Sequence, residues 1–130
     1  MSSFQPSKPK TYLEIGRNFL NISEGQFPIN EPSQIIKFRT ASDFANELNI
    51  HVNHLNRSVK LLTGHTTTEN INQAILKEAK RLLRRNQWPI HIIAMVLAFK
   101  EATHFSNFFK RRLIKSTYFF STTYNYATLF

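Results

Sequence analysis

The sequence predicts an all-α protein made of two helix-turn-helix subdomains joined by a long linker helix, a homeodomain-like arrangement. Two observations predict this fold class. One pattern of small and bulky apolar residues occurs twice, about 49 residues apart. Between the two copies lies a stretch whose apolar residues recur at helical spacing. A pair of compact helical units with a helical spacer satisfies both observations.

The first copy of the pattern predicts two short helices between residues 40 and 62. Thr40 or Ser42 can cap the first of them. Asn49 lies at the turn, and Asn adopts a left-handed backbone more readily than most non-glycine residues. Gly64 is suited to cap the end of the second helix. The apolar residues expected to face inward are Phe44, Ala45, Leu48, Val52, Leu55, Val59 and Leu62.

The stretch between the copies predicts a linker helix over residues 68 to about 86. At 1.5 Å per residue this helix is roughly 25 Å long, so it can hold two small units at a set distance. Its apolar stripe consists of Ile71, Ala74, Ile75, Ala79, Leu82 and Leu83. Its basic residues are interpreted as a solvated helix face in preference to direct phosphate contacts: Lys77, Lys80, Arg81, Arg84 and Arg85.

The second copy predicts a helix that has Pro89 in its first turn, where the missing N–H has no partner to lose. Ala98 occupies the position of Asn49, and a left-handed backbone there costs Ala on the order of 1 kcal/mol relative to Gly. The following helix is expected over residues 101–112. The inward-facing residues are Ile90, Ile93, Ala94, Leu97, Phe105, Phe108 and Phe109.

The rest of the chain is expected to flank these units. Residues 1–39 form an N-terminal extension in which Tyr12, Ile15 and Phe19 predict a short helix, followed by a connector rich in Pro and Ser. The domain itself spans residues 40–121, with a first unit at about 40–66 and a second at about 88–121. Residues 122–130 form an uncharged C-terminal tail.

The charge of the chain predicts a polyanionic partner. The formal net charge is +9. Residues 1–70 carry 7 Lys and Arg against 6 acids, and residues 71–130 carry 10 against 2, so the excess lies in the second half. Charge alone does not separate DNA from RNA or an anionic membrane surface. Together with the repeated helix-turn-helix pattern, it makes double-stranded DNA the leading partner.

Other features argue against several alternative classes. The chain has no Cys, and its longest apolar run, residues 92–99, is too short to span a bilayer. The N-terminus lacks a secretory signal, so a cytoplasmic protein with no membrane partner is expected. With 3 Gly in the chain there is no glycine-rich phosphate loop, and there is no paired-carboxylate signature, so no enzyme and no cofactor are predicted. His51 and His54 lack further ligands nearby for a metal site.

Three blocks of the sequence resemble the DNA-binding domain of AraC/XylS-type transcription regulators, a bacterial family. The first block runs from Phe44 to Gly64, the second is Glu78 to Leu83, and the third runs from Ile93 to Lys110. The resemblance covers about residues 40–121. It implies two recognition helices that enter successive major grooves, and RNA polymerase subunits as further partners.

The chain departs from the family pattern at four positions. The family usually carries Gly at Ala98 and near Ile114, Pro at Thr117 and Arg at Ser121. All four lie in the second unit or just beyond it, so altered geometry is expected there. Members of the family also commonly carry a sensor or dimerisation domain before this one. The 39 preceding residues are too few for such a domain, so no small-molecule sensor is expected.

The candidate DNA-contacting residues lie on the second helix of each unit. Asn pairs well with adenine and Arg with guanine in the major groove. The residues expected to contact bases are Asn53, Asn56 and Arg57 on the first recognition helix and, by the resemblance, Thr103, His104 and Asn107 on the second. Those expected to contact phosphates are Lys60, Lys110, Arg111 and Arg112. His51 and His54 are nearby candidates, and for His54 packing against the turn is the preferred interpretation.

Each of these assignments has a competing interpretation. An exposed Asn on a helix is often only a solvated side chain. A chain this basic can also bind RNA or any nucleic acid through charge alone. A third hypothesis is a protein-interaction module that has kept the fold and lost DNA binding. Competition between one duplex and excess random duplex distinguishes a specific binder from a charge-driven one.

Overall fold

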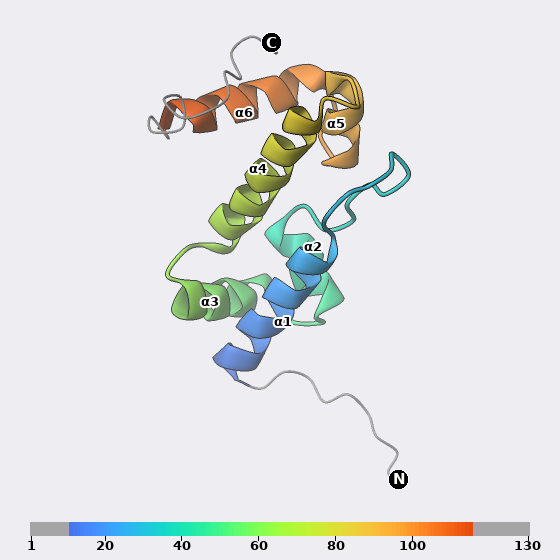
Figure 1. Ribbon diagram of the computed structural model, residues 1–130. Coiled ribbons are helices and arrows are strands. Elements are labelled where there is room, and N and C mark those ends of the chain that lie inside the picture. The colour runs from blue at the N-terminus through green and yellow to red at the C-terminus, as the bar shows by residue number, and fades with distance from the viewer. Residues whose placement is uncertain (1–10, 116–130) are drawn as a thin grey trace. The chain divides into compact units, whose positions relative to one another are not determined.

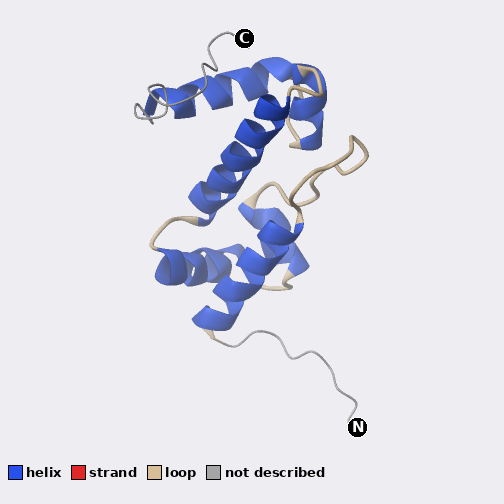
Figure 2. Cartoon of the chain, viewed as in Figure 1, coloured by secondary structure: helices blue, strands red, loops and turns tan. Residues whose placement is uncertain are grey.

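The computed structural model describes residues 11–115, and every regular element within that range is a helix (Figures 1 and 2). The elements are α1 (Tyr12–Gly25), α2 (Ala41–Glu47), α3 (Val52–Thr63), α4 (Thr67–Arg85), α5 (Ile90–Val96) and α6 (Ala102–Lys115). The predicted all-α class is therefore confirmed. Residues 1–10, the expected end of the second unit at 116–121, with Thr117 and Ser121, and the tail at 122–130 lie outside the described residues.

The helices form two compact units, whose described parts differ from the expected division. The first unit consists of residues 11–27 and 37–74, and the second of residues 28–36 and 75–115. The boundary between Ala74 and Ile75 falls inside α4. Compared with the expectation from the sequence, the structure adds α1 to the first unit and residues 28–36 to the second.

The first unit is built around apolar side chains from α1, α2 and α3. Phe19 and Phe44 are fully buried, and their rings meet edge to face with centroids 4.7 Å apart. Leu55 and Val59 of α3 are fully buried as well. Helix α1 lies so close to α3 that a Cβ added at Gly16 would come within 2.7 Å of Leu62 Cδ2. Helix α1 is thus a structural part of this helix-turn-helix, because it supplies a third wall of its core.

Polar caps fix the ends of the helices in the first unit. Thr40 Oγ1 accepts a hydrogen bond from Asp43 N, and Asp43 Oδ2 accepts one from Thr40 N, which makes a capping box at the start of α2. Asp43 Oδ2 also accepts a hydrogen bond from Arg39 N at 2.8 Å, and this bond is the main cause that lowers the pKa of Asp43. Gly64 ends α3 with φ 81°, the left-handed cap that the sequence predicts.

One amide side chain holds the chain between α1 and α2 in the first unit. Gln26 Oε1 accepts hydrogen bonds from Lys37 N at 2.9 Å and Phe38 N at 2.8 Å, and Gln26 Nε2 donates to Phe38 O at 3.0 Å. Phe38 then packs its ring 5.5 Å from that of Phe44. The residue that caps the end of α1 is therefore hydrogen-bonded to the backbone of the segment that leads into α2.

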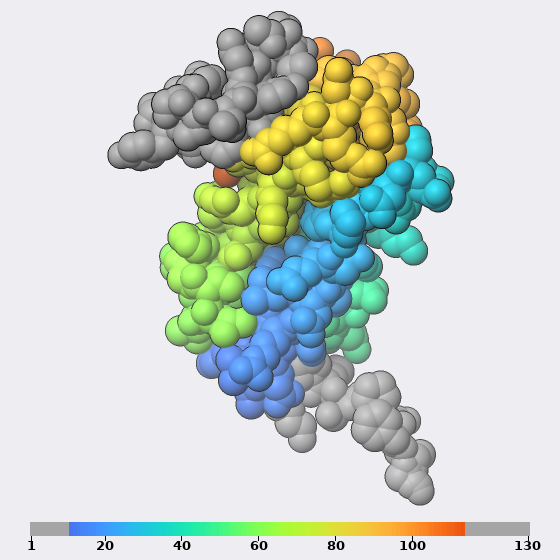
Figure 3. Space-filling view, in the orientation of Figure 1, coloured from blue at the N-terminus to red at the C-terminus, as the bar shows by residue number. Residues whose placement is uncertain are grey.

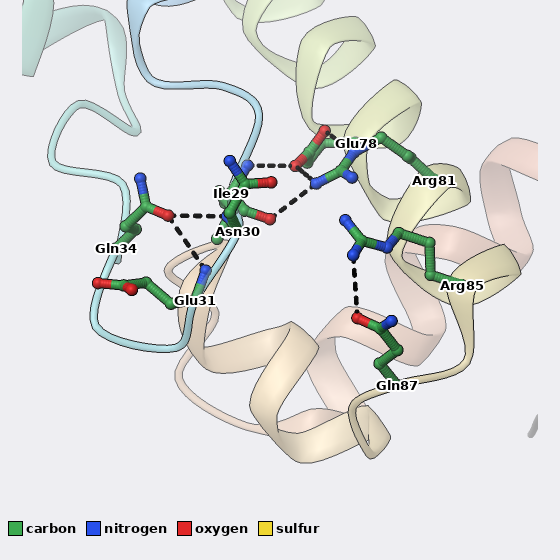
Figure 4. A network of polar contacts seen from close by, with 8 residues as sticks. All are labelled: Ile29, Asn30, Glu31, Gln34, Glu78, Arg81, Arg85 and Gln87. Carbon is green, nitrogen blue, oxygen red and sulfur yellow. Dashed lines mark hydrogen bonds and ion pairs between the residues drawn. The ribbon is translucent and has the colours of Figure 1, made fainter.

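A charged pair on α4 holds residues 28–36 in the second unit (Figure 4). Glu78, only 5% exposed, accepts a hydrogen bond from Ile29 N at 2.7 Å and pairs with Arg81 at 2.7 Å. Arg81 Nη2 donates in turn to Ile29 O at 2.7 Å. The hydrogen bond to Glu78 raises the pKa of Arg81. The two side chains thus bind both backbone polar groups of Ile29, whose own side chain is fully buried.

The remaining core of the second unit lies between α4, α5 and α6. Ile93 of α5, its C-cap residue Leu97, and Phe105 and Phe109 of α6 are buried. The backbone N–H of Ile36 donates to Val96 O at 3.0 Å, which ties the connector to the end of α5. Figure 3 shows this connector, in cyan, against the yellow and orange atoms of the same unit. Pro89 is the N-cap of α5, one residue before the helix, and not part of its first turn as expected.

Candidate nucleic-acid interface

The turn between α2 and α3 follows the hydrogen-bond pattern of a Schellman motif. Asn49 is left-handed with φ 57°, as the sequence predicts. Its N–H donates to Asn46 O at 3.1 Å, and the next N–H, of Ile50, donates to Ala45 O at 3.0 Å. These bonds satisfy carbonyls that the end of α2 would otherwise leave without a partner. Asn49 therefore has a defined structural role, because its left-handed backbone turns two N–H groups back toward the end of α2.

The turn between α5 and α6 repeats these bonds in the second unit. Ala98 is left-handed with φ 64°. Its N–H donates to Met95 O at 3.0 Å, and the Phe99 N–H donates to Ala94 O at 2.9 Å. Ala98 therefore does adopt the left-handed backbone whose cost the sequence analysis considered, and the hydrogen bonds of the turn are the same as in the first unit. The alteration expected here is limited to a strained φ, because a Cβ is disfavoured in the left-handed region.

The candidate contact residues of α3 share one exposed face. Asn53, Asn56, Arg57 and Lys60 follow one another at helical spacings of three, one and three residues, and all are exposed. Leu55, Ser58 and Val59 lie on the buried side of the same helix. The structure therefore brings together all the candidates that the sequence places on this helix.

Arg57 contacts α1 as well as facing solvent. Its Nη1 donates to the hydroxyl of Tyr12 at 3.3 Å, and this hydrogen bond raises the pKa of Arg57. The Tyr12 ring meets the ring of His54 edge to face, with centroids 5.8 Å apart. His54 thus packs against another side chain, as expected, although its partner is Tyr12 of α1 and not the turn. Tyr12 is a neighbour of this face that sequence reasoning missed.

Both ends of α3 are fixed by side chains near the candidate face. His51 is the N-cap, and its Nδ1 accepts a hydrogen bond from Asn53 N at 3.1 Å. Lys60 Nζ donates to Gly64 O at 3.1 Å, so this candidate phosphate-binding side chain is hydrogen-bonded to the C-terminal end of its own helix. A Lys ammonium has three N–H donors, and the bond to Gly64 uses one of them.

Helix α6 presents an exposed face at positions matching those of α3. Thr103, Asn107 and Lys110 are exposed and lie four and three residues apart. These residues come 50 positions after Asn53, Arg57 and Lys60. The two copies are about 49 residues apart, and the second has one extra residue between its turn and its second helix. The exposed face of α6 also includes His104 and Arg111.

Arg112 lies apart from the other candidates on α6. It is half-buried, and its guanidinium carbon lies 5.1 Å from the centroid of the Phe108 ring. The Phe108 ring is also half-buried and lies 5.2 Å from that of Phe99. Arg112 therefore covers the aromatic cluster at this side of the helix. Phe108 is a boundary residue, while Phe105 and Phe109 are buried core residues as predicted.

The basic residues of α4 do not form one solvated face, contrary to the expectation. Lys77 and Arg84 are exposed, and Arg85 Nη2 donates to Gln87 Oε1 at 3.1 Å. Arg81 instead binds Glu78 and the connector, and Lys80 is half-buried. Burial lowers the pKa of Lys80, and the charge of Arg84 adds to that effect. The solvated-face interpretation is wrong for Arg81, because this side chain binds the backbone of Ile29, a residue 52 positions away in the sequence.

Two further features bear on the class of site. Among residues 11–115, no three His, Cys, Asp or Glu side chains are grouped so that they could hold a metal ion. No helix within the same range is long and apolar enough to cross a membrane.

The comparisons with known proteins agree with this geometry. A family model described as a helix-turn-helix domain matches residues 44–116, more than half of the 130 residues. A comparison with curated proteins and one with solved structures gave no significant match. The matched residues include both turns and both candidate recognition helices, and the model supports DNA binding and a role in transcription regulation. The chain belongs to the AraC-type helix-turn-helix family.

Proposed function

We propose that the protein binds a specific double-stranded DNA sequence through α3 and α6, each placed in a major groove, and thereby regulates transcription. One observation carries the proposal. Three exposed residues on α3 and three on α6 occupy matching positions of the repeat, behind turns with the same hydrogen bonds. A helix-turn-helix uses such a face of its second helix to contact base edges.

The side chains on the two faces have the chemistry that base reading requires. The amides of Asn53 and Asn56 can bond adenine N6 and N7, and the guanidinium of Arg57 can bond guanine O6 and N7. On α6, Thr103 occupies the position equivalent to Asn53, and Asn107 the position equivalent to Arg57. His104 is exposed beside Thr103. We propose that these six residues select the sequence.

Phosphate contacts are assigned to cations in the C-terminal half of each recognition helix. Lys60 and Lys110 occupy equivalent positions on α3 and α6, and Arg111 is exposed beside Lys110. Arg112 contributes less, because it packs against Phe108. Such contacts increase affinity for any sequence and make binding dependent on salt.

Helix α4 supplies the spacer that two grooves require. It runs without interruption over 19 residues, about 28 Å at 1.5 Å per residue. Consecutive major grooves on one side of B-form DNA are about 34 Å apart. We propose that α3 and α6 occupy successive grooves of one duplex.

The test begins with selection of duplexes from a random pool by the full chain, followed by titration of variants at several salt concentrations. Arg57→Ala should weaken the selected duplex by about 5- to 150-fold and relax the choice at one base pair. Lys110→Ala should weaken all duplexes similarly and reduce the salt slope by about 1. Lys77→Ala, which removes an exposed charge from α4, is the matched control. It should change the choice of base less than Arg57→Ala does, and the salt slope less than Lys110→Ala does.

The spacing of the two half-sites tests the two-groove arrangement. Inserting about 5 base pairs between the halves of the selected site turns one half to the other side of the duplex. Binding should then fall to that of a single half-site. Unchanged affinity would show that only one unit binds.

Two outcomes would replace the proposal. Equal losses on selected and random duplex for both Arg57→Ala and Lys110→Ala would indicate binding by charge alone, which the excess of basic residues after position 70 would support. No duplex recovered at moderate salt, from a chain shown to be helical by circular dichroism, would indicate a protein-interaction module.

A further inference from the structure

Helix α1 places one polar aromatic side chain against the candidate recognition face. Tyr12 is the first residue of α1, which is capped by Thr11 through a hydrogen bond from Glu14 N to Thr11 Oγ1 at 3.1 Å. One turn further along, Gly16 brings α1 into close contact with Leu62 of α3. The cap and the close packing hold Tyr12 beside α3.

Tyr12 makes two different contacts with α3. Its ring packs edge to face against His54, which orients the ring. Its hydroxyl then accepts the hydrogen bond from Arg57 Nη1 at 3.3 Å. Tyr12 is 39% exposed, so this bond lies at the surface of the unit beside the face that carries Asn53 and Asn56.

The orientation of Arg57 matters more than that of a phosphate-binding cation. Reading guanine requires two parallel N–H donors aimed at O6 and N7, so the plane of the guanidinium must be set. An Arg side chain has about 2 kcal/mol of rotamer entropy that binding must overcome. A guanidinium has five N–H donors, and the bond to Tyr12 uses one. A partner that holds one nitrogen therefore reduces the entropy lost on binding.

We propose that Tyr12 is a positioning residue that orients Arg57 for base recognition, so that α1 takes part in sequence discrimination without contacting a base. The inference rests on the proposed function of α3. It assigns to the region before the repeated pattern a role in specificity.

The experiment uses Tyr12→Phe in the full chain, because Phe keeps the ring against His54 and removes only the hydroxyl. Affinity is measured for the selected duplex, for the same duplex changed at the base pair read by Arg57, and for random duplex. We expect Tyr12→Phe to reduce discrimination at that base pair by about 2- to 10-fold. Affinity for random duplex should change by less than about twofold, because the bond adds no phosphate contact.

A double-mutant cycle separates positioning from a general effect on folding. In an Arg57→Ala background, Tyr12→Phe should have no further effect on discrimination. Leu13→Ala is the matched control, since Leu13 is an exposed neighbour on α1 at 47%. It should leave discrimination unchanged. Circular dichroism melting identifies any variant that has lost the fold.

The outcomes distinguish the inference from the proposed function. If Arg57→Ala relaxes discrimination and Tyr12→Phe does not, the positioning role of Tyr12 is wrong and base reading by Arg57 stands. The same conclusion follows if Tyr12→Phe acts equally with and without Arg57. If Arg57→Ala itself leaves discrimination unchanged, base reading by Arg57 is wrong and the inference is overturned with it.

Discussion

The two helix-turn-helix units make the same turn from different residues and begin it in different ways. Helix α2 starts with a capping box in which Asp43 carries a charge, whereas α5 starts after Pro89, which has no polar side chain to cap it. The first turn uses Asn49 and the second Ala98 in the left-handed region. The backbone bonds of the two turns nevertheless correspond one to one.

The same backbone turn therefore forms with either Asn or Ala at the left-handed position. In both units the residue after the left-handed position is apolar, Ile50 in one and Phe99 in the other. A Schellman motif is stabilised by an apolar contact from that residue. Phe99 lies 5.4 Å from Phe105, a fully buried residue, which provides such an anchor. The anchor can hold Ala98 in a conformation that Ala alone disfavours.

The side chains that hold the segment between α1 and α2, Glu78 in the second unit and Gln26 in the first, should give the largest difference between the units. Glu78→Ala removes the acceptor of Ile29 N–H, and an unsatisfied buried group costs about 1–3 kcal/mol. Gln26→Ala removes the neutral clamp of the first unit and should cost less, because hydrogen bonds to charged groups are stronger. Urea unfolding followed by the fluorescence of Trp88 measures the effect of Glu78→Ala. Trp88 is the only Trp of the chain and belongs to the second unit.

Hydrogen exchange locates the effect of each clamp. The Ile29 amide should exchange faster in Glu78→Ala but not in Gln26→Ala, and the Phe38 amide should respond in the opposite way. Equal exchange of Ile29 in both variants would contradict separate anchoring of Ile29 by Glu78 and of Phe38 by Gln26.

The capping box at the start of α2 predicts that the stability of the first unit depends on pH. The pKa of Asp43 is lowered on folding, so its contribution is present above the unfolded pKa and is lost as pH falls through the folded pKa. At pH 7 Asp43→Ala should destabilise by about 0.5–2 kcal/mol, the usual range for a helix cap. The difference in the free energy of unfolding between wild type and variant should become smaller below about pH 4, the pKa of Asp in the unfolded chain.

Thermal unfolding at several pH values, measured by circular dichroism, tests this prediction. Ser42→Ala, at an exposed position of the same helix, serves as the control and should show no such narrowing. A gap for Asp43→Ala that stays constant to pH 2 would mean that the charge of Asp43 does not contribute to the cap.

The turn residues should give the smallest effects, with opposite signs. Ala98→Gly relieves a left-handed Ala and should stabilise by up to about 1 kcal/mol, while Asn49→Ala should destabilise by about 1 kcal/mol. Chemical denaturation of the two variants against wild type measures both. Destabilisation by Ala98→Gly would show that the Ala98 methyl group contributes more through packing than its φ costs.

Much of the fold was predictable from the sequence because it follows from short-range rules. The capped start of α2, the left-handed Asn49 and the glycine cap at Gly64 all depend on residues within one or two helical turns. The exposed faces of α3 and α6 follow from helical periodicity in the same way. The candidate contact residues on α3 could therefore be grouped correctly without coordinates.

Only the tertiary structure decided how residues 11–39 are used. The bonds from Arg57 to Tyr12, from Ile29 to Glu78 and from Arg81 to Ile29 join residues 45, 49 and 52 positions apart. Periodicity and capping act over three or four residues, so they carry no information about such pairs. The helical units follow from the sequence by local rules, whereas their attachment to α1 and the connector depends on which surfaces meet when the chain packs.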